Sequence, residues 1–172
     1  LIGLALTPLG QIHQTAGNLN NHIGLPLTIL EAPLGADAWV LELGMNHLGE
    51  IDLLQEIGRP TVRLITNVGA AHLQGVGSIE RVAQAKGELF DGAQPGDTLI
   101  INADDPHIAS LPLPEGVREI RYGTSMDSDI RLTDAAIDPN TLQTRFRIQT
   151  PTGRVLGSIP SPGLHLAHNA TA

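Results

Sequence analysis

The sequence contains no cysteine, so it can form neither a disulfide nor a thiolate metal site. It has no apolar run approaching the ~20 residues of a membrane span, and no charged segment followed by an apolar one at its start. Basic residues are few: 10 Lys and Arg stand against 18 Asp and Glu, giving a net charge of −8. This charge argues against nucleic acid or an anionic membrane as a partner. We therefore expect a soluble, cytoplasmic protein.

Aromatic residues are also scarce, at 2% of the 172 residues, so the core must be aliphatic. Three nearly continuous apolar runs predict strands that are buried on both faces, at residues 38–43, 61–66 and 98–102. Helices are predicted between them, around residues 49–57 and 79–90, the second with Ser78 as its N-cap. Strands that alternate with helices predict the α/β class, with a doubly wound, mostly parallel sheet.

The pattern changes after about Val117. Shorter segments now alternate polar and apolar residues, which is typical of a half-exposed antiparallel sheet, at residues 118–122, 144–149 and 154–159. We therefore expect a parallel α/β part at residues 1–117, a small antiparallel β appendage at 118–160 and the start of a helix at 161–172.

Of the 10 Lys and Arg residues, Lys86 is the only lysine. Arginine stays charged, whereas a lysine can lose its proton when its surroundings lower its pKa. Lys86 lies in the second predicted helix, and a place on a solvated helix face is the simpler interpretation of a single lysine. A functional role for Lys86 is favoured by the polar residues that follow the predicted strands.

Those polar residues are Glu42 near the end of the first strand, Asn67 and His72 after the second, and the Asn102–Asp105 turn after the third. Ligands of open parallel sheets bind beyond the carboxyl ends of the strands. A carboxylate such as Glu42 in an apolar run needs a partner, which could be an arginine, a metal or a substrate. His72 could be a second metal ligand, while the Asn102–Asp105 turn could equally serve as an ordinary cap.

An Asn-rich segment near the start, residues 15–24, places neutral donors and acceptors around Gly17. Such groups suit phosphate and amide substrates, and a plain Asn-rich turn is the alternative interpretation.

Five motifs in order give a wider resemblance. They are Thr-x-Gly-Asn-Leu-Asn-Asn-x-Ile-Gly-x-Pro from Thr15, Glu-Leu-Gly-x-Asn-His-x-Gly-Glu-Ile from Glu42, Asn-x-x-Ala-Ala-His-Leu from Asn67, Ala-Lys-Gly-Glu-Leu-Phe from Ala85 and Asn-Ala-Asp-Asp from Asn102. From about Thr15 to Ala172 the chain resembles the central domain of the Mur ligases, which has a P-loop NTPase-like fold. It is most similar to the subgroup that uses D-alanyl-D-alanine.

The resemblance implies an ATP-dependent peptide ligase of peptidoglycan precursor synthesis. Such an enzyme joins D-alanyl-D-alanine to UDP-N-acetylmuramoyl-tripeptide through an acyl phosphate. It implies ATP and Mg²⁺ as cofactors, with Glu42 and His72 on the metal. Lys86 would react with CO₂ to give a carbamate, an oxygen ligand of the hard kind that Mg²⁺ prefers.

The same resemblance implies further contacts. The nucleotide and its phosphates would be bound by Asn18, Asn102, Asp104 and Asn169, and the muropeptide by Thr15, Asn20 and Asn21. Leu166 stands where the family usually has Asn. The family's P-loop, Gly-x-x-Gly-Lys-Thr/Ser, does not occur in the chain. We therefore expect the P-loop and the amino- and carboxy-terminal domains to belong to the same protein outside this chain, which alone would not turn over ATP.

Two other hypotheses stay open. A metal-dependent hydrolase could use Glu42, His72 and an Asp of the Asn102–Asp105 turn around an activated water. A non-catalytic nucleotide-binding module descended from a ligase would also keep the motifs.

Overall fold

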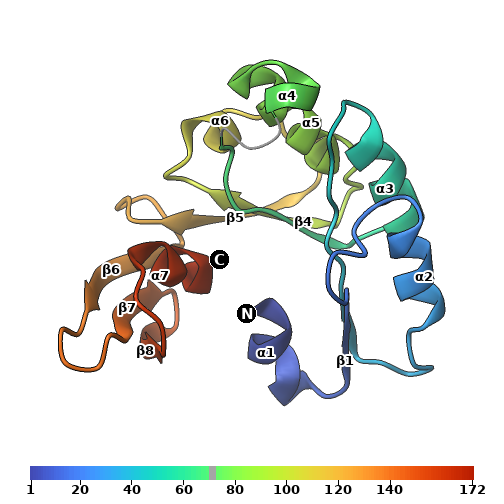
Figure 1. Ribbon diagram of the computed structural model, residues 1–172. Coiled ribbons are helices and arrows are strands. Elements are labelled where there is room, and N and C mark those ends of the chain that lie inside the picture. The colour runs from blue at the N-terminus through green and yellow to red at the C-terminus, as the bar shows by residue number, and fades with distance from the viewer. Residues whose placement is uncertain (70–72) are drawn as a thin grey trace.

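The computed structural model describes residues 1–69 and 73–172 (Figure 1). Within these residues the strands form two sheets. In the first, β1 (Ile12–Gln14) pairs in parallel with β2 (Ala38–Val40). The second has the order β3-β4-β5-β6-β7-β8, with β3 (Val62–Ile65), β4 (Thr98–Asn102), β5 (Arg118–Gly123), β6 (Ile130–Ile137), β7 (Thr144–Thr150) and β8 (Gly153–Ile159). The predicted α/β class with a mostly parallel sheet is confirmed.

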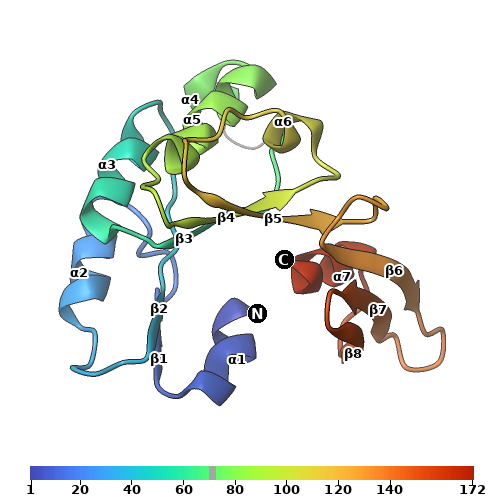
Figure 2. The same cartoon turned by 180° about the vertical axis from the view of Figure 1, so that it is seen from behind.

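The helices lie on both sides of these strands. They are α1 (Ile2–Leu6), the 3₁₀ turn η1 (Thr7–Leu9), α2 (Gly24–Leu30), α3 (Glu50–Gly58), α4 (Leu73–Val76), α5 (Ile79–Asp91), α6 (Pro106–Ala109) and α7 (Leu164–Thr171). Figures 1 and 2 show α2 to α6 along the outer side, and α1, α7 and both chain ends on the inner side. Across the described part of the chain, no helix has the length and apolar character needed to cross a membrane.

The position of β5 corrects the sequence-based prediction. Residues 118–122 were expected in the antiparallel sheet, but β5 runs parallel to β4 along its length and parallel to the start of β6. Antiparallel pairing begins only between β6 and β7 and continues between β7 and β8. Alternation of polar and apolar residues reports that one face is exposed, and it does not report the direction of the neighbouring strand. The parallel part therefore extends through β5, and the antiparallel strands continue the same sheet.

The first predicted strand is also shorter and more open than expected. Strand β2 ends at Val40, so Glu42 lies beyond it and is exposed. Trp39 in the middle of the strand is 47% exposed, which contradicts burial on both faces. Among the described residues β2 pairs only with β1, so the apolar run does not lie in the middle of a sheet.

The core is aliphatic, as predicted, and lies mainly between the outer helices and the strands. One cluster joins α2, α3 and α5 to the loop after β2, through Leu25, Met45, Ile51, Leu54, Val76, Val82 and Ala85. A second lies against β3 and β4, with Ile65, Phe90, Ala93, Leu99, Ile101 and Ile108. Helix α7 packs on β6 and β7 through Leu132, Ile148 and Ala167. Ser78 caps α5 as predicted, since its hydroxyl accepts from the Arg81 amide at 3.3 Å.

A buried arginine joins β3 to the end of α5. Arg63 is 3% exposed and donates to the side chain of Gln55 on α3 at 3.1 Å. It also donates to the backbone carbonyls of Leu89 and Gly92, at 3.0 Å each, and to the carboxylate of Asp97 at 3.1 Å. The last carbonyls of a helix have no partner within it, and a cation there also complements the helix dipole. Arg63 therefore fixes the carboxyl end of α5 against the sheet.

Replacing Arg63 with alanine should lower the free energy of unfolding by about 3–5 kcal/mol, because the Asp97 carboxylate and the helix carbonyls would lose a buried partner. Urea unfolding of the intact protein that carries this chain measures the loss. Arg81→Ala, at an exposed position of the same helix, serves as the control and should change stability by no more than about 0.5 kcal/mol. Equal effects of the two substitutions would contradict the role given to Arg63.

Candidate functional site

The loops that follow β1 and β2 are held together by hydrogen bonds around Glu42. The hydroxyl of Thr15 accepts from the Glu42 amide at 2.9 Å, and the side-chain amide of Asn20 donates to Glu42 Oε1 at 2.8 Å. The Gly44 amide in turn donates to the backbone carbonyl of Asn20 at 2.8 Å. Three residues that the sequence singled out therefore meet at the carboxyl ends of two parallel strands.

The environment of Glu42 differs from the expected one. Its side chain is exposed, and its partner among the described residues is a neutral amide. A carboxylate has two oxygens and about four lone-pair sites, so a bond from one amide leaves capacity for a cation.

The other two asparagines of this segment have different surroundings. Asn21 Oδ1 accepts from the amides of Ile23 and Gly24, at 3.0 and 2.9 Å, and so orders the start of α2. Asn18 is exposed beside Gly17, whose positive φ of 57° forms the turn. Asn21 thus has a structural role in addition to the substrate contact that stays a prediction.

Lys86 points from α5 to the loop that follows β3. Its ammonium donates to the backbone carbonyl of Asn67 at 2.7 Å, and the residue is half-buried. Burial lowers the pKa of the Lys86 ammonium below its ordinary value, and the negative charge of Asp105 partly opposes that shift. His72, which the sequence placed next to this loop, lies outside the described residues.

Side chains from the neighbouring strands fix this loop. The Thr66 carbonyl accepts from the side-chain amide of Asn102 at 2.7 Å and from the hydroxyl of Tyr122 at 3.1 Å. The Val68 amide donates to Asp105 Oδ2 at 2.6 Å. Burial, with the charges of nearby aspartates, raises the pKa of Tyr122 to about 12, so its hydroxyl remains a donor at neutral pH. Lys86 therefore hydrogen-bonds to a backbone carbonyl whose two neighbours along the chain are already anchored.

The carboxylate of Asp104, in the turn after β4, binds Thr124, the residue that follows β5. It accepts from the Thr124 amide, at 3.0 and 2.8 Å for its two oxygens, and from the Thr124 hydroxyl at 3.0 Å. His168 Nδ1 on α7 lies 3.6 Å from Asp104 Oδ2. The pair links the antiparallel end of the fold to the turn after β4.

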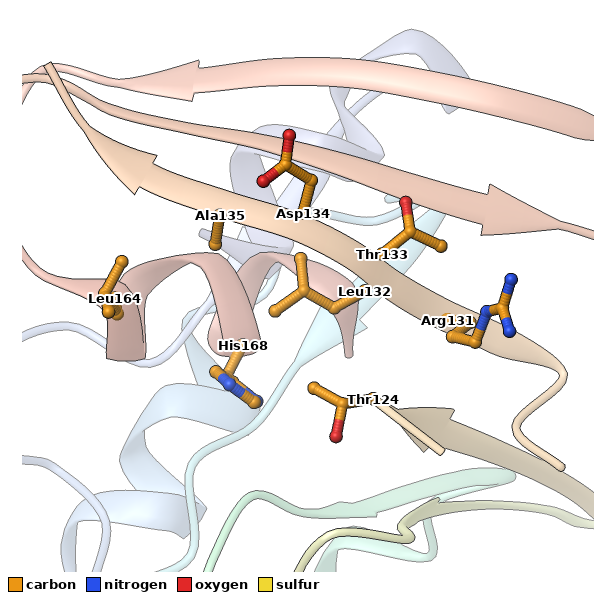
Figure 3. A pocket seen from close by; sticks show the side chains of 8 residues that line it. All are labelled: Thr124, Arg131, Leu132, Thr133, Asp134, Ala135, Leu164 and His168. Atoms are coloured by element: carbon orange, nitrogen blue, oxygen red, sulfur yellow. The ribbon is translucent and has the colours of Figure 1, made fainter. Parts of the chain in front are cut away.

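A pocket of about 460 Å³ opens beside this pair, between β6 and α7 (Figure 3). It is lined by Thr124, Arg131, Leu132, Thr133, Asp134, Ala135, Leu164 and His168. Sequence reasoning chose Asn169, which is exposed and does not line the pocket, and it missed Thr124 and His168. His168 directly precedes Asn169, so the motif identified the helix but not the face that points into the pocket.

The loops that carry Glu42 and Asn67 are packed together. Met45 of the first loop and Ala85 of α5 belong to one buried cluster, against which Val68 also packs. A Cβ atom on Gly75 of α4 would lie 2.3 Å from the Asn46 carbonyl, so only glycine fits there. The two loops and α5 are therefore one structural unit.

Within residues 1–69 and 73–172, no group of three or more His, Asp or Glu side chains could hold a metal ion. Asp104 and Asp105 already bind Thr124 and Val68, and Asp105 Oδ1 also caps α6 at 3.0 and 3.3 Å from the amides of His107 and Ile108. Both aspartates of this turn therefore act as caps of loop or helix backbone, one of the two roles that the sequence left open.

Comparisons with known proteins agree on one family. The sequence model of the Mur ligase middle domain matches residues 1–172. The chain is 40% identical over 169 residues to the UDP-N-acetylmuramoyl-tripeptide–D-alanyl-D-alanine ligase of Escherichia coli K12, which covers 97% of the chain and 37% of that protein. The enzyme of the same name from Bacillus subtilis 168 is 38% identical over 162 residues, and this alignment covers 94% of the chain and 34% of that protein. The chain thus spans little more than a third of the length of these relatives.

Solved structures give the same picture. A crystal structure of MurF from Acinetobacter baumannii superposes with a TM-score of 0.89 at 31% identity, over 99% of this chain and 37% of that one. MurF ligase from Thermotoga maritima, in complex with ADP, superposes with a TM-score of 0.81 at 27% identity, over 96% and 38%.

The Lys86 ammonium should titrate below the ordinary lysine pKa of ~10.4. Between the lowered and the ordinary value, the folded protein binds fewer protons than the unfolded chain, so the free energy of unfolding should rise with pH in that window. Below the lowered pKa, the cost of burying the ammonium is fully present. The titration can be followed by ¹³Cε NMR of lysine-labelled intact protein in CO₂-free buffer.

Loss of one resonance in Lys86→Arg assigns the signal, and free lysine in the same sample is the reference. Asp105→Asn should lower the midpoint further, because it removes the charge that opposes the shift. A midpoint at or above that of free lysine would be inconsistent with the burial of this amine.

Proposed function

The chain belongs to the Mur ligase family, and we propose that it serves as the middle domain of an ATP-dependent ligase. The substrates would be UDP-N-acetylmuramoyl-tripeptide and D-alanyl-D-alanine, by similarity to the relatives that carry these names, and the reaction would take place in the bacterial cytoplasm. One observation carries the proposal. The exposed Glu42 carboxylate lies on the loop after β2, the half-buried Lys86 amine bonds to the loop after β3, and these two loops pack together at the strand ends.

The proposed reaction has two steps. The terminal carboxylate of the tripeptide attacks the γ-phosphate of ATP, which forms an acyl phosphate and releases ADP. The amine of D-alanyl-D-alanine then attacks the acyl carbon, and inorganic phosphate leaves as the amide bond forms. Both steps depend on the positioning of reactants and on the stabilisation of charge on phosphate oxygens.

The residues present fit a magnesium site. Glu42 offers carboxylate oxygen at an exposed loop, held in place by Thr15 and Asn20. The lowered pKa of Lys86 favours the neutral amine, the form that adds to CO₂, and the resulting carbamate would offer hard oxygen. We propose that Glu42, His72 and the carbamate of Lys86 hold Mg²⁺, which when bound neutralises charge on the phosphates.

Other residues would bind and orient the substrates. The pocket between β6 and α7 has the size and the mixture of apolar and polar walls typical of a small-molecule site, and we assign it to the nucleoside of ATP. Leu132 and Leu164 would pack against the base, and Thr124 and His168 would provide polar contacts. Asn18, exposed in its turn, would face the phosphates.

Lys86→Arg should reduce kcat by about 100-fold or more, the scale seen when one group that stabilises transition-state charge is removed. The substitution keeps a cation but cannot form a carbamate. The assay is ADP release from the intact protein, dependent on both muropeptide and D-alanyl-D-alanine. Arg81→Lys, on the exposed face of the same helix, should keep full activity. Near-normal turnover by Lys86→Arg would refute the carbamate role.

His168→Ala should raise the KM for ATP by about 10-fold, roughly the loss of one good polar contact, and should change kcat much less. The reason is that the pocket would lose both a polar wall and its link to Asp104. His107→Ala, which alters a histidine outside this pocket, is the matched control and should leave the KM unchanged. An unchanged KM for ATP in His168→Ala would refute the assignment of this pocket to the nucleoside.

A further inference from the structure

Helix α3 is capped by a residue from another helix. Its N-cap position is occupied by Gly49, which adopts φ 86° and has no side chain to accept from the amides of the first turn. Glu88, in the second half of α5, takes that place: its Oε1 accepts from the Gly49 amide at 2.7 Å and its Oε2 from the Asp52 amide at 3.2 Å. Asp52 is the third residue of the helical segment, whose amide an N-cap side chain normally binds. Glu88 thus performs the function of an N-cap from 39 residues away in sequence.

The capped turn is the end of the loop that begins at Glu42. The amides of Asn46 and His47, in the middle of this loop, donate to the carboxylate of Glu50, the first residue of α3. These bonds, the first of them foremost, lower the pKa of Glu50. Because Glu50 belongs to α3 itself, it shapes the loop but does not attach it to anything else. The bonds of Glu88 attach it to α5.

Helix α5 also carries Lys86, two residues before Glu88. One stretch of helix therefore contacts both loops of the site: Lys86 bonds to the loop after β3, and Glu88 bonds to the loop after β2. Hydrogen bonds from backbone amides to a carboxylate are charge-assisted, and the amino end of a helix favours a negative charge. A neutral or displaced side chain at position 88 would loosen one loop relative to the other.

We propose that Glu88 is a positioning residue of the ligase site: its carboxylate fixes the loop that carries Glu42 against the helix that carries Lys86. This inference rests on the proposed function, because a fixed distance between Glu42 and Lys86 matters only if both bind the same Mg²⁺. It adds a residue that neither binds substrate nor contacts the metal.

The test is Glu88→Gln in the intact protein, which keeps the size of the side chain but removes its charge and one acceptor oxygen. The Mg²⁺ concentration for half-maximal ADP release should rise by about 10-fold or more, as for other residues that orient metal ligands. The kcat at saturating Mg²⁺ should fall less. Independently of activity, amide hydrogen exchange at Gly49 and Asp52 should accelerate.

Two controls separate positioning from stability. Glu56→Gln changes an exposed carboxylate on α3 and should alter neither measurement. Leu54→Ala removes a side chain that is 1% exposed in the core under α3, and should lower the melting temperature without shifting the Mg²⁺ requirement.

The outcomes are distinct. A Glu88→Gln enzyme with a normal Mg²⁺ requirement, or one shifted no more than Leu54→Ala, overturns the positioning role while the ligase function stands. A wild-type protein that releases no ADP with both substrates overturns the proposed function and this role with it. Unchanged exchange at Gly49 and Asp52 would show that the cap does not exist in solution.

Discussion

Hydrogen bonds from side chains to loop backbone hold the candidate site together. A loop at the end of a strand leaves amides and carbonyls without sheet partners, and each must find one or lose free energy when buried. Here the partners come from neighbouring elements: the Thr66 carbonyl is bound by Asn102 and Tyr122, and the Val68 amide by Asp105. The loops therefore take their shape from the strands and helices around them.

Around the candidate site, the acidic residues that bond to loop backbone differ from Glu42. Asp104, Asp105 and Glu88 accept from backbone amides and hold loops or helix ends in place. Glu42 is different, since its side chain is exposed and receives one bond from the neutral amide of Asn20. The Glu42 carboxylate therefore keeps capacity for a cation, whereas these three carboxylates are occupied by backbone amides.

Helix α5 links these features. Arg63 binds its carboxyl end to β3, Ser78 caps its amino end, and between them Lys86 and Glu88 contact the two loops. A helix anchored at its carboxyl end and packed in the core through Val82, Ala85 and Phe90 transmits little movement to the groups it carries. This rigidity suits a family whose proposed chemistry depends on the positioning of phosphates and on the stabilisation of their charge.

The sequence by itself determined the α/β class, the aliphatic core, the Ser78 cap and, through five ordered motifs, the family. These features depend on local periodicity and on short segments whose residue types are visible in the chain. The grouping of Thr15, Asn20 and Glu42 was not predicted, because residues 12–14 were not expected to form a strand beside residues 38–40.

Only the tertiary structure decided the direction of β5, the exposure of Glu42, the place of His168 rather than Asn169 at the pocket, and the cap that Glu88 provides. Each of these depends on which distant segment lies alongside. Periodicity records how much of a face is buried and not what buries it, and a hydrogen bond that spans 39 residues leaves no local pattern.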